Sequence, residues 1–538
     1  FKQKTAYEML RSLVGSEMCI RDSLYHQQIL SAAGFLNPAA ALRNLRSLAG
    51  PEPARSLFAR LAILAADILR TKPDPDMALN NWERFVAALP HRDDHFALLL
   101  AQPARLDILL TIFSGSQFLA DTLVAHPEWF DWATDPAVIR PLRSPSDVRN
   151  DLLAACPHPS QPAWRAAVRR SRRRELLRIA TRDIWLGAPL PETVAEISAV
   201  ADALTAATLE QCWLRLANDL AACDGIDDPA RHLCLLAFGK LGGNELNYSS
   251  DIDLLAVCDD VSFSVRYRDG RTKSHKELYA AILEQLRADL SAHTEDGYAY
   301  RVDFRLRPYG SSGELVPSVN TVLSYYRHHA ALWELQAALK LRPIAGAHCI
   351  GAYLLNALRP LLAAPRCHAD VAASINRMRQ RAAQISSVTA TGTDIKNGPG
   401  GIRDIEFLVQ GLQMIYAARL PALLDANTLR ALALLRRANL LPETIATQLD
   451  EDYCFLRRLE HFLQLLEDRQ THSLPSSEAA LTALARRMSG PATDAASFAA
   501  GLASRMSRSR AAYETYLLSP HGSLLNPNSS PSSNDKNC

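Results

Sequence analysis

The chain has 538 residues, more than one ordinary hydrophobic core accommodates, so we expect about two to four domains of roughly 100–200 residues each. Hydrophobic residues make up 48% and charged residues 22% of the chain, which is typical of a globular protein in water. The formal net charge of +2 gives no support to a DNA or RNA partner. No stretch reaches the roughly 18–20 apolar residues that a membrane-spanning helix needs, so we expect no membrane partner.

The ten cysteines form no CxxC pair and have no regular spacing, which indicates a reducing, cytoplasmic setting. His348-Cys349 and Cys367-His368 are adjacent pairs. One segment cannot easily direct both side chains of such a pair at one ion, so the sequence does not favour a zinc site.

The first half of the chain predicts helices. Residues 1–23 differ in character from the rest of the chain, and we interpret them as an atypical leader that is not native to the protein. Residues 24–225 repeat apolar positions every three or four residues, for example in Ala54–Arg70 and Ser171–Trp185, which predicts an N-terminal helical domain. The basic run Arg169–Arg174 (RRSRRR) is interpreted as a solvated helix face rather than a binding site.

The pattern changes over residues 226–345. Three segments read as strands of one small mixed sheet: Leu233–Phe238, Ile252–Val257 and Tyr298–Leu306. Ser274–His293 reads as a helix between the second strand and the third. We expect this part of the chain to be the catalytic domain.

Residues 346–519 predict a C-terminal bundle of about five helices, with Ile405–Ala417 and Asp450–Arg469 as the clearest members. Residues 520–538 are rich in Ser, Asn and Pro, and we expect them to be disordered. The predicted fold class is therefore α+β and mostly helical, with a small mixed-sheet domain flanked by the N-terminal helical domain and the C-terminal bundle.

The sequence that carries chemistry begins where the first predicted strand runs into a glycine-rich turn and a helix start. The second predicted strand then carries Asp251 and Asp253. Side chains two residues apart on a strand point the same way, so these two carboxylates share a face while Ile252 and Leu254 bury on the other.

Two carboxylates so close repel one another unless a cation lies between them, and Mg²⁺ favours oxygen ligands together with phosphate oxygens. Glycines let the backbone approach a phosphate, and the N–H groups at a helix start favour its negative charge. Lys240 and Ser250 add a cation and a hydrogen-bond donor. Alternatively, the two aspartates are an exposed strand end and the glycines a tight turn; the ordered combination of strand, glycine turn and acidic strand favours a site.

A third segment extends this site. Along residues 300–307 the side chains alternate strictly, which places Arg301, Asp303, Arg305 and Arg307 on one face of the predicted strand. Asp303 can complete a three-carboxylate metal site, and arginines bind phosphates in a fork geometry. The alternative is an exposed charged face with local ion pairs. These parts suit nucleotidyl transfer, in which two metal ions hold the attacking and leaving oxygens in line.

At this point the sequence resembles a known family. Phe238-Gly239-Lys240, ten residues, and Asp251-Ile252-Asp253-Leu254 resemble the signature of DNA polymerase β-like nucleotidyltransferases, from which Lys240 departs. The strings GKLGGNELNYSSDIDLL, YRVDFRLRPYGSSGELVPS and GPGGIRDIEFLVQ resemble the bifunctional glutamine synthetase adenylyltransferase/adenylyl-removing enzymes. The matching strings span about 118–506. The family's Trp-Glu-Arg-Gln stretch reads Trp333-Glu334-Leu335-Gln336 here, so an arginine of the cleft is replaced.

The resemblance implies which half of that two-half family is represented. Only one set of the motifs is present, so we expect a fragment or a single-activity relative. Asn247, Ile252 and Arg403 favour the N-terminal, adenylyl-removing half. That half implies phosphorolysis, in which inorganic phosphate attacks the AMP on a glutamine synthetase tyrosine and ADP leaves.

The resemblance also implies the roles of residues. Asp251, Asp253 and Asp303 would be catalytic and would hold Mg²⁺, two ions being expected, with ATP or ADP and phosphate as substrates or products. The expected nucleotide- and phosphate-binding residues are Gly239, Lys240, Gly242, Gly243, Ser250, Arg305, Arg307 and Arg403.

Several further charged residues admit two interpretations. Arg403, Asp404 and Glu406 either face the cleft or form a capped, solvated helix start. Glu334, Lys340 and Arg342 either line the cleft or make surface ion pairs.

Two other functions stay open. The same fold could transfer AMP from ATP to the tyrosine of glutamine synthetase, or the chain could be a catalytically inert helical regulatory fragment. By resemblance, the expected partners are glutamine synthetase and the nitrogen-signalling PII protein.

Overall fold

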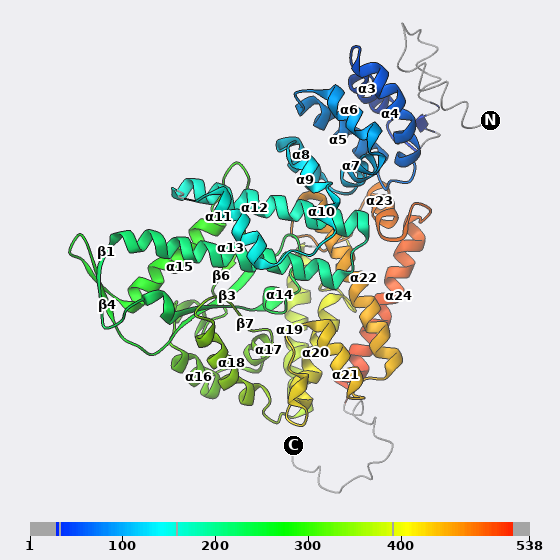
Figure 1. Cartoon of the computed structure of the whole chain (residues 1–538). Coiled ribbons are helices and arrows are strands. Elements are labelled where there is room, and N and C mark those ends of the chain that lie inside the picture. Colours follow the sequence, from blue (N-terminus) through cyan, green and yellow to red (C-terminus); the bar gives the residue numbers. More distant parts are fainter. Residues whose placement is uncertain (1–27, 29, 32–33, 158–159, 390–391, 520–538) are drawn as a thin grey trace. The chain divides into compact units, whose positions relative to one another are not determined.

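The computed structural model describes residues 28, 30–31, 34–157, 160–389 and 392–519 (Figure 1). The predicted leader, 1–23, and the predicted disordered tail, 520–538, lie outside the described residues. The predicted fold class is confirmed, because the described chain is mostly helical and contains two small sheets. No single described helix is long and apolar enough to cross a bilayer; α6 (Arg92–Ala101) and α7 (Pro103–Gly115) reach that length only together, across a bend of 113°.

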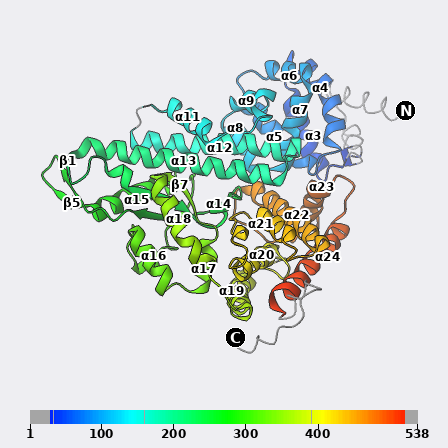
Figure 2. The same ribbon diagram turned by 60° about the horizontal axis from the view of Figure 1, so that its bottom comes forward.

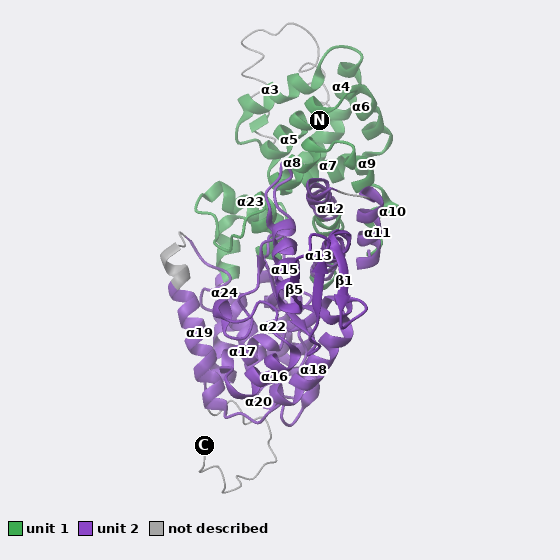
Figure 3. Ribbon diagram, turned by 90° about the vertical axis from the view of Figure 1, so that its left-hand side faces the viewer, with its two compact units in different colours: residues 1–142, 176–193, 458–502 green, residues 143–175, 194–457, 503–538 purple. Residues whose placement is uncertain are grey.

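The chain divides into two compact units, each made of segments that lie far apart in the sequence (Figure 3). Unit 1 comprises 1–142, 176–193 and 458–502, and unit 2 comprises 143–175, 194–457 and 503–538. The predicted domains, 24–225, 226–345 and 346–519, are continuous segments, whereas each unit combines several segments. The two divisions cannot be compared directly, and the domain boundaries stay a prediction.

Four long helices contribute residues to both units: α12 (Gln161–Thr181), α13 (Leu190–Asp219), α22 (Glu443–Glu467) and α24 (Ala495–Tyr513). The other helices of unit 1, besides α6 and α7, are α3 (Pro38–Ala49), α4 (Ala54–Leu69), α5 (Pro75–Ala88), α8 (Gln117–Ala125), α9 (Trp129–Ala133), α10 (Pro136–Ile139), α23 (Glu478–Ser489) and the π-helix η1 (Arg182–Leu186). The predicted helices Ala54–Arg70 and Ser171–Trp185 agree with α4 and with the end of α12 continued by η1.

The larger sheet, which lies in unit 2, has four strands in the order β6 (Val302–Asp303), β3 (Ile252–Cys258), β2 (Leu233–Ala237) and β7 (Arg342–Gly346). Strand β2 runs antiparallel to β3 and β7, whereas β6 runs parallel to β3. The first two predicted strands are thus confirmed. The predicted helix Ser274–His293 is α15 (His275–Ser291), which begins at a capping box made by Ser274 and Glu277.

One face of the larger sheet carries a hydrophobic core. Leu255 and Val257 of β3 and Cys234 and Leu236 of β2 are buried in one cluster with α16 (Val319–His328), α17 (Leu332–Ala338) and α18 (His348–Leu362). Helix α18 packs against β2, β3 and β7 (Figure 2). Asp253 has the same strand parity as Leu255 and Val257, so the predicted site lies on this face, at the end of β3 where the apolar core stops.

A second sheet was not predicted. It has three antiparallel strands in the order β1 (Leu220–Asp224), β4 (Ser264–Tyr267) and β5 (Thr272–Ser274). The prediction of a single sheet was wrong because these strands are only three to five residues long, which is too short for an apolar alternation to mark them in the sequence.

The rest of unit 2 is helical. After residue 346 the described chain, which contributes to both units, has seven α-helices rather than about five, counting α18, α22, α23 and α24. The other three are α19 (His368–Thr389), α20 (Ile402–Tyr416) and α21 (Thr428–Arg437). The remaining elements of unit 2 are α11 (Pro145–Ala155), α14 (Gly239–Gly242), the 3₁₀-helices η2 (Pro229–His232), η3 (Gly310–Ser312) and η4 (Pro421–Leu423), and the π-helix η5 (Glu514–Leu518).

The predicted strand Tyr298–Leu306 is wrong in extent, since β6 contains only Val302 and Asp303. The chain leaves the strand because the Asp303 carboxylate accepts the backbone N–H of Arg305 at 2.7 Å. An aspartate that binds the amide two residues ahead closes a turn, and it competes with continued strand pairing.

The interpretation of Arg169–Arg174 as a solvated face is also wrong. Arg169 and Arg172 are buried, and burial lowers the pKa of Arg169 to about 10. The Arg169 guanidinium donates to backbone carbonyls at the end of α15, including that of Asp289 at 2.9 Å. Arg172 donates to the Tyr248 carbonyl at 2.8 Å. These cations are structural, because they satisfy buried carbonyl groups that water cannot reach.

A pH dependence follows from the core of unit 1. The His95 ring lies edge-on to the rings of Phe85 and Phe130, with centroids 5.3 and 5.5 Å away, and burial lowers the pKa of His95 to about 4. Above about pH 6.5 the residue is neutral in both folded and unfolded chains. Between about pH 6.5 and 4 the unfolded chain binds a proton that the folded chain refuses. We therefore expect the free energy of unfolding to decrease as the pH is lowered through this range, by up to ~1.4 kcal/mol for each pH unit.

Calorimetric unfolding of the wild type and two variants across this pH range checks the expectation. His95→Leu should flatten the dependence, whereas His91→Gln, at an exposed position, should keep it. Equal slopes in His95→Leu and wild type would contradict the assignment.

Candidate functional site

Asp253 and Asp303 face the same side of the larger sheet, because they are paired in register across the parallel strands β3 and β6. Asp251 precedes Asp253 by two residues and shares that side, while Ile252 and Leu254 are buried on the other. Burial, together with the carboxylates of Asp303 and Asp251, raises the pKa of Asp253 to about 6. The structure therefore brings the three predicted carboxylates together; their roles stay predictions.

Two arginines engage the outer carboxylates. Arg301 forms an ion pair with Asp251. Arg305 binds Asp303 in a fork, with Nε 2.8 Å and Nη2 2.6 Å from Oδ2, and these hydrogen bonds hold the pKa of Asp303 below its usual range. Among the described residues no three His, Cys, Asp or Glu side chains are already gathered as metal ligands. Asp251 and Asp303 would have to exchange arginine for a metal ion.

Asp251 and Asp303 border a cavity of about 400 Å³ whose wall carries many charged side chains. Its lining residues include Asp251, Arg301, Asp303, Arg305 and Arg307. A cavity with both carboxylates and guanidinium groups in its wall offers ligands for a cation and donors for an anion in one place.

The predicted phosphate contact Arg307 has a different set of partners in this structure. Its Nη1 donates to the Phe304 carbonyl at 2.9 Å, and its Nε and Nη2 donate to the carbonyls of Gly313 and Ser311, each at 3.2 Å. Arg307 therefore closes the loop that follows β6, while Arg305, with 79% of its side chain exposed, is the more accessible guanidinium.

The three predicted glycines differ in their surroundings. Gly239 has φ +59°, and a Cβ there would lie 3.0 Å from Oδ2 of Asp253, so this glycine borders the carboxylates. A Cβ on Gly242 would meet the Lys340 carbonyl oxygen at 1.8 Å, and one on Gly243 would meet that of Ala426 at 2.9 Å. Close packing explains glycine at these two positions. Binding of a phosphate by the backbone of this one-turn helix stays a prediction.

Lys396 precedes helix α20 and Glu406 lies within it, and both interact electrostatically with charged groups of the site. The positive charge of Lys396 favours the charged form of Asp253 and so counteracts part of the rise that burial causes in the pKa of Asp253. Burial disfavours the charged form of Glu406, but Lys340, Lys240 and further cations, among them Lys396, keep the pKa of Glu406 below its ordinary value. The predicted phosphate contact Lys240 is thus within electrostatic reach of Glu406.

Other predicted residues of this region have structural partners. The Arg403 guanidinium lies over the Phe407 ring at 5.8 Å. Asp404 is buried and paired with Arg379 and Arg510, so the interpretation of a solvated helix start was wrong for this residue. Ser250 is half-buried directly before Asp251.

The other charged residues with two interpretations, Glu334, Lys340 and Arg342, differ in their surroundings. Lys340 is buried and forms an ion pair with buried Glu245, so the interpretation of a surface ion pair was wrong for Lys340. Arg342 binds Asp202 in a fork at 2.7 and 3.0 Å. Glu334 lines a cavity next to the site.

The loop that leads into Asp251 is held by buried polar groups that the sequence did not reveal. Arg457 donates to the Glu245 carbonyl at 2.6 Å and binds the Asn247 side chain. Ser198 accepts the N–H of Leu246 at 3.0 Å. These contacts come from α22 and α13, far away in the sequence, so no local signal could have found them. Lys396 was missed for a similar reason, although its place just before the GPGG turn was a usable signal.

Comparison with known proteins gives the relationship. The family model for glutamate-ammonia ligase adenylyltransferase matches residues 106–357, and that for GlnD PII-uridylyltransferase matches residues 369–517. A bifunctional glutamine synthetase adenylyltransferase/adenylyl-removing enzyme of Streptomyces coelicolor is 34% identical over 467 residues. Enzymes of the same description from Nitrosococcus oceani and Shewanella frigidimarina are 36% and 32% identical over 357 and 370 residues.

This chain is a homologue of those bifunctional enzymes. The matches cover 85%, 66% and 69% of this chain, but 43%, 36% and 39% of the three relatives, so the chain spans about two fifths of their length. The predicted resemblance to this family is confirmed.

Gly239 offers a test of the site geometry that needs no ligand. Alanine is strained at a positive φ by about 1–2 kcal/mol, and at this position its Cβ would also press on the Asp253 carboxylate. Gly270 has φ +86° and open space around it, so Gly270→Ala carries the backbone strain alone. We expect Gly239→Ala to lower the free energy of unfolding more than Gly270→Ala does, measured by urea denaturation. Equal losses would show that Gly239 does not abut Asp253.

Proposed function

We propose that this chain is a metal-dependent nucleotidyltransferase that removes AMP from the adenylylated tyrosine of glutamine synthetase by phosphorolysis. The observation that carries the proposal is the in-register pairing of Asp303 with Asp253, which sets three carboxylates on one face of the sheet, and two of them, Asp251 and Asp303, line a cavity with a charged wall. Homology supports the substrate, since the relatives are described as acting on glutamine synthetase.

The residues present suit a divalent metal ion. Asp251, Asp253 and Asp303 provide oxygen ligands of the kind that Mg²⁺ favours. The raised pKa of Asp253 reflects burial together with repulsion from two neighbouring carboxylates, which is the charge pattern that a bound cation relieves. When bound, Mg²⁺ would neutralise charge on the phosphate oxygens during transfer.

The chain's own residues would bind and orient the reacting groups. Arg305, the exposed guanidinium, and Arg301 would exchange their carboxylate partners for phosphate oxygens. Lys396, whose positive charge acts on Asp253, would favour an anion there. In the transfer an oxygen of inorganic phosphate bonds to the phosphorus of AMP, the bond to the tyrosyl oxygen breaks, and the proton of the phosphate ends on the tyrosine. ADP and unmodified tyrosine are the products.

The direction of the reaction rests on the resemblance rather than on the site. Two of the residues that favour the adenylyl-removing half, Asn247 and Ile252, are buried in the fold. The relatives are described as bifunctional, which favours transfer of AMP from ATP to the tyrosine as the second candidate. The match of 369–517 to a PII-uridylyltransferase model supports a PII protein as a further partner.

The experiment incubates the purified chain with adenylylated glutamine synthetase, inorganic phosphate and Mg²⁺, and measures ADP by chromatography and the loss of AMP from the synthetase by mass spectrometry. We expect ADP release that stops on addition of EDTA. Asp253→Asn should lower the rate at least ~100-fold, because it removes a carboxylate that would hold the cation, and the cation would neutralise charge on the phosphate oxygens.

Circular dichroism of Asp253→Asn should match the wild type, which separates loss of activity from loss of folding. A matched assay contains unmodified synthetase and ATP in place of phosphate. Pyrophosphate release there, without ADP release in the first assay, would establish the forward reaction instead. A folded chain that is inactive in both assays would be the inert regulatory fragment, and unchanged activity in Asp253→Asn would refute the carboxylate site.

A further inference from the structure

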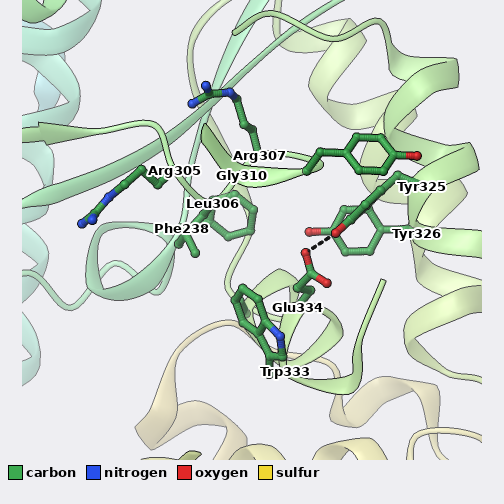
Figure 4. A pocket seen from close by; sticks show the side chains of 11 residues that line it. Phe238, Arg305, Leu306, Arg307, Gly310, Tyr325, Tyr326, Trp333 and Glu334 are labelled. Atoms are coloured by element: carbon green, nitrogen blue, oxygen red, sulfur yellow. Dashed lines mark hydrogen bonds between the residues drawn. The ribbon is translucent and has the colours of Figure 1, made fainter. Parts of the chain in front are cut away.

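Figure 4 shows a second cavity, whose volume is about 260 Å³. Arg305 and Arg307 line both cavities. Much of the remaining wall is aromatic: Phe238, Tyr309, Tyr325, Tyr326 and Trp333. The two cavities are therefore neighbours with different chemistry, one charged and one aromatic.

Phe238 ties the aromatic cavity to the carboxylates through the backbone. Its N–H donates to the Asp253 carbonyl at 2.8 Å, and the next residue is Gly239, which borders the Asp253 carboxylate. In Figure 4 the guanidinium groups of Arg305 and Arg307 extend away from the aromatic rings. A nucleotide with its phosphate near Asp253 would thus be long enough to reach Phe238 and the aromatic rings beyond it.

The aromatic cavity exposes ring surface. Trp333 is 43% exposed and Tyr309 is 55% exposed, which is unusual for such large side chains. Tyr309 has φ +62°, a left-handed conformation that non-glycine residues rarely adopt, and its ring meets that of Tyr325 edge-on at 4.7 Å. Arg307 holds this loop through three backbone carbonyls. Strained backbone of this kind gathers where a ligand is held.

One carboxylate lies in the aromatic wall. Glu334 accepts the Tyr325 hydroxyl at 2.6 Å and the N–H of Ala331 at 2.9 Å, and these contacts fix its orientation (Figure 4). A carboxylate has about four acceptor positions, so Glu334 keeps capacity for a further donor.

We propose that this cavity binds the adenine ring of the nucleotide. The inference rests on the proposed function and names the subsite for its base. Adenine stacks on aromatic rings, and its exocyclic amine can donate to Glu334. The tyrosine ring of the protein substrate fits less well. Its oxygen is esterified to AMP and has no hydrogen to donate to Glu334.

Isothermal titration of the full chain with ADP, GDP and pyrophosphate tests the proposal without relying on turnover. Trp333→Leu should weaken ADP binding at least ~10-fold, since stacking on a base is worth about 1–3 kcal/mol. Pyrophosphate, which lacks a base, should bind the variant as it binds the wild type. Tyr353→Leu, which removes an exposed aromatic side chain outside the cavity, should bind ADP unchanged.

Glu334→Gln tests the carboxylate. Its shape allows the Tyr325 contact to persist, but its amide can donate to the guanine carbonyl, so the preference for ADP over GDP should fall several-fold. Equal ADP affinity in wild type, Trp333→Leu and Glu334→Gln would overturn the subsite while leaving the proposed function standing. Failure of the wild type to bind ADP would overturn it as well.

A third outcome would show whether the cavity binds the adenine ring or the tyrosine ring of the substrate. If Trp333→Leu binds ADP normally but binds a tyrosine-containing peptide of glutamine synthetase more weakly than wild type does, the cavity holds the tyrosine and the proposal is wrong. The proposed function is tested by a different measurement, because it fails if the wild type releases no ADP. The adenine subsite is tested by ADP binding.

Discussion

The parallel pairing of β6 with β3 is the constraint on which the site depends. Parallel register places Asp303 opposite Asp253, and strand alternation then sets Asp251 on the same face. A shift of one residue in this short strand would turn Asp303 to the opposite face and present Val302 in its place. The strand is only two residues long, so its position is maintained by its surroundings: the Asp303 turn on one side and the N–H of Ile252, which donates to the Arg301 carbonyl at 3.0 Å, on the other.

The acidic face is in turn supported by buried cations. Arg172 and Arg457 donate to carbonyls of the loop that leads into Asp251, and Lys340 is buried against Glu245 at the start of that loop. Buried charges are costly unless every donor is satisfied, and removal of one partner typically costs about 3–5 kcal/mol. Such groups favour one loop conformation, because few other arrangements bring these carbonyls and Glu245 within reach of the same cations.

The sequence predicted those parts of the structure that depend on local pattern. The apolar runs gave β2 and β3, the helical periodicity gave α4, α15 and α20, and the spacing of the aspartates gave a shared face. It failed where long-range contacts decide the outcome. Arg169 looked solvated because its carbonyl partners lie more than a hundred residues away, and Lys340 looked like a surface cation because Glu245 is similarly distant in the sequence. Alternation over 300–307 predicted a long strand, but the Asp303 side chain ended it.

The ion pairs of Arg301 with Asp251 and of Arg305 with Asp303 give the ligand-free site a self-neutralised charge. An anion that draws a guanidinium away leaves a carboxylate uncompensated, and a cation that takes the carboxylate leaves a guanidinium uncompensated. A bound anion would therefore lower the free-energy cost of binding a cation, and the reverse would hold as well. By thermodynamic linkage, each ion would raise the affinity for the other by the same factor. The proposed site would therefore bind a cation and an anion together more readily than either ion alone.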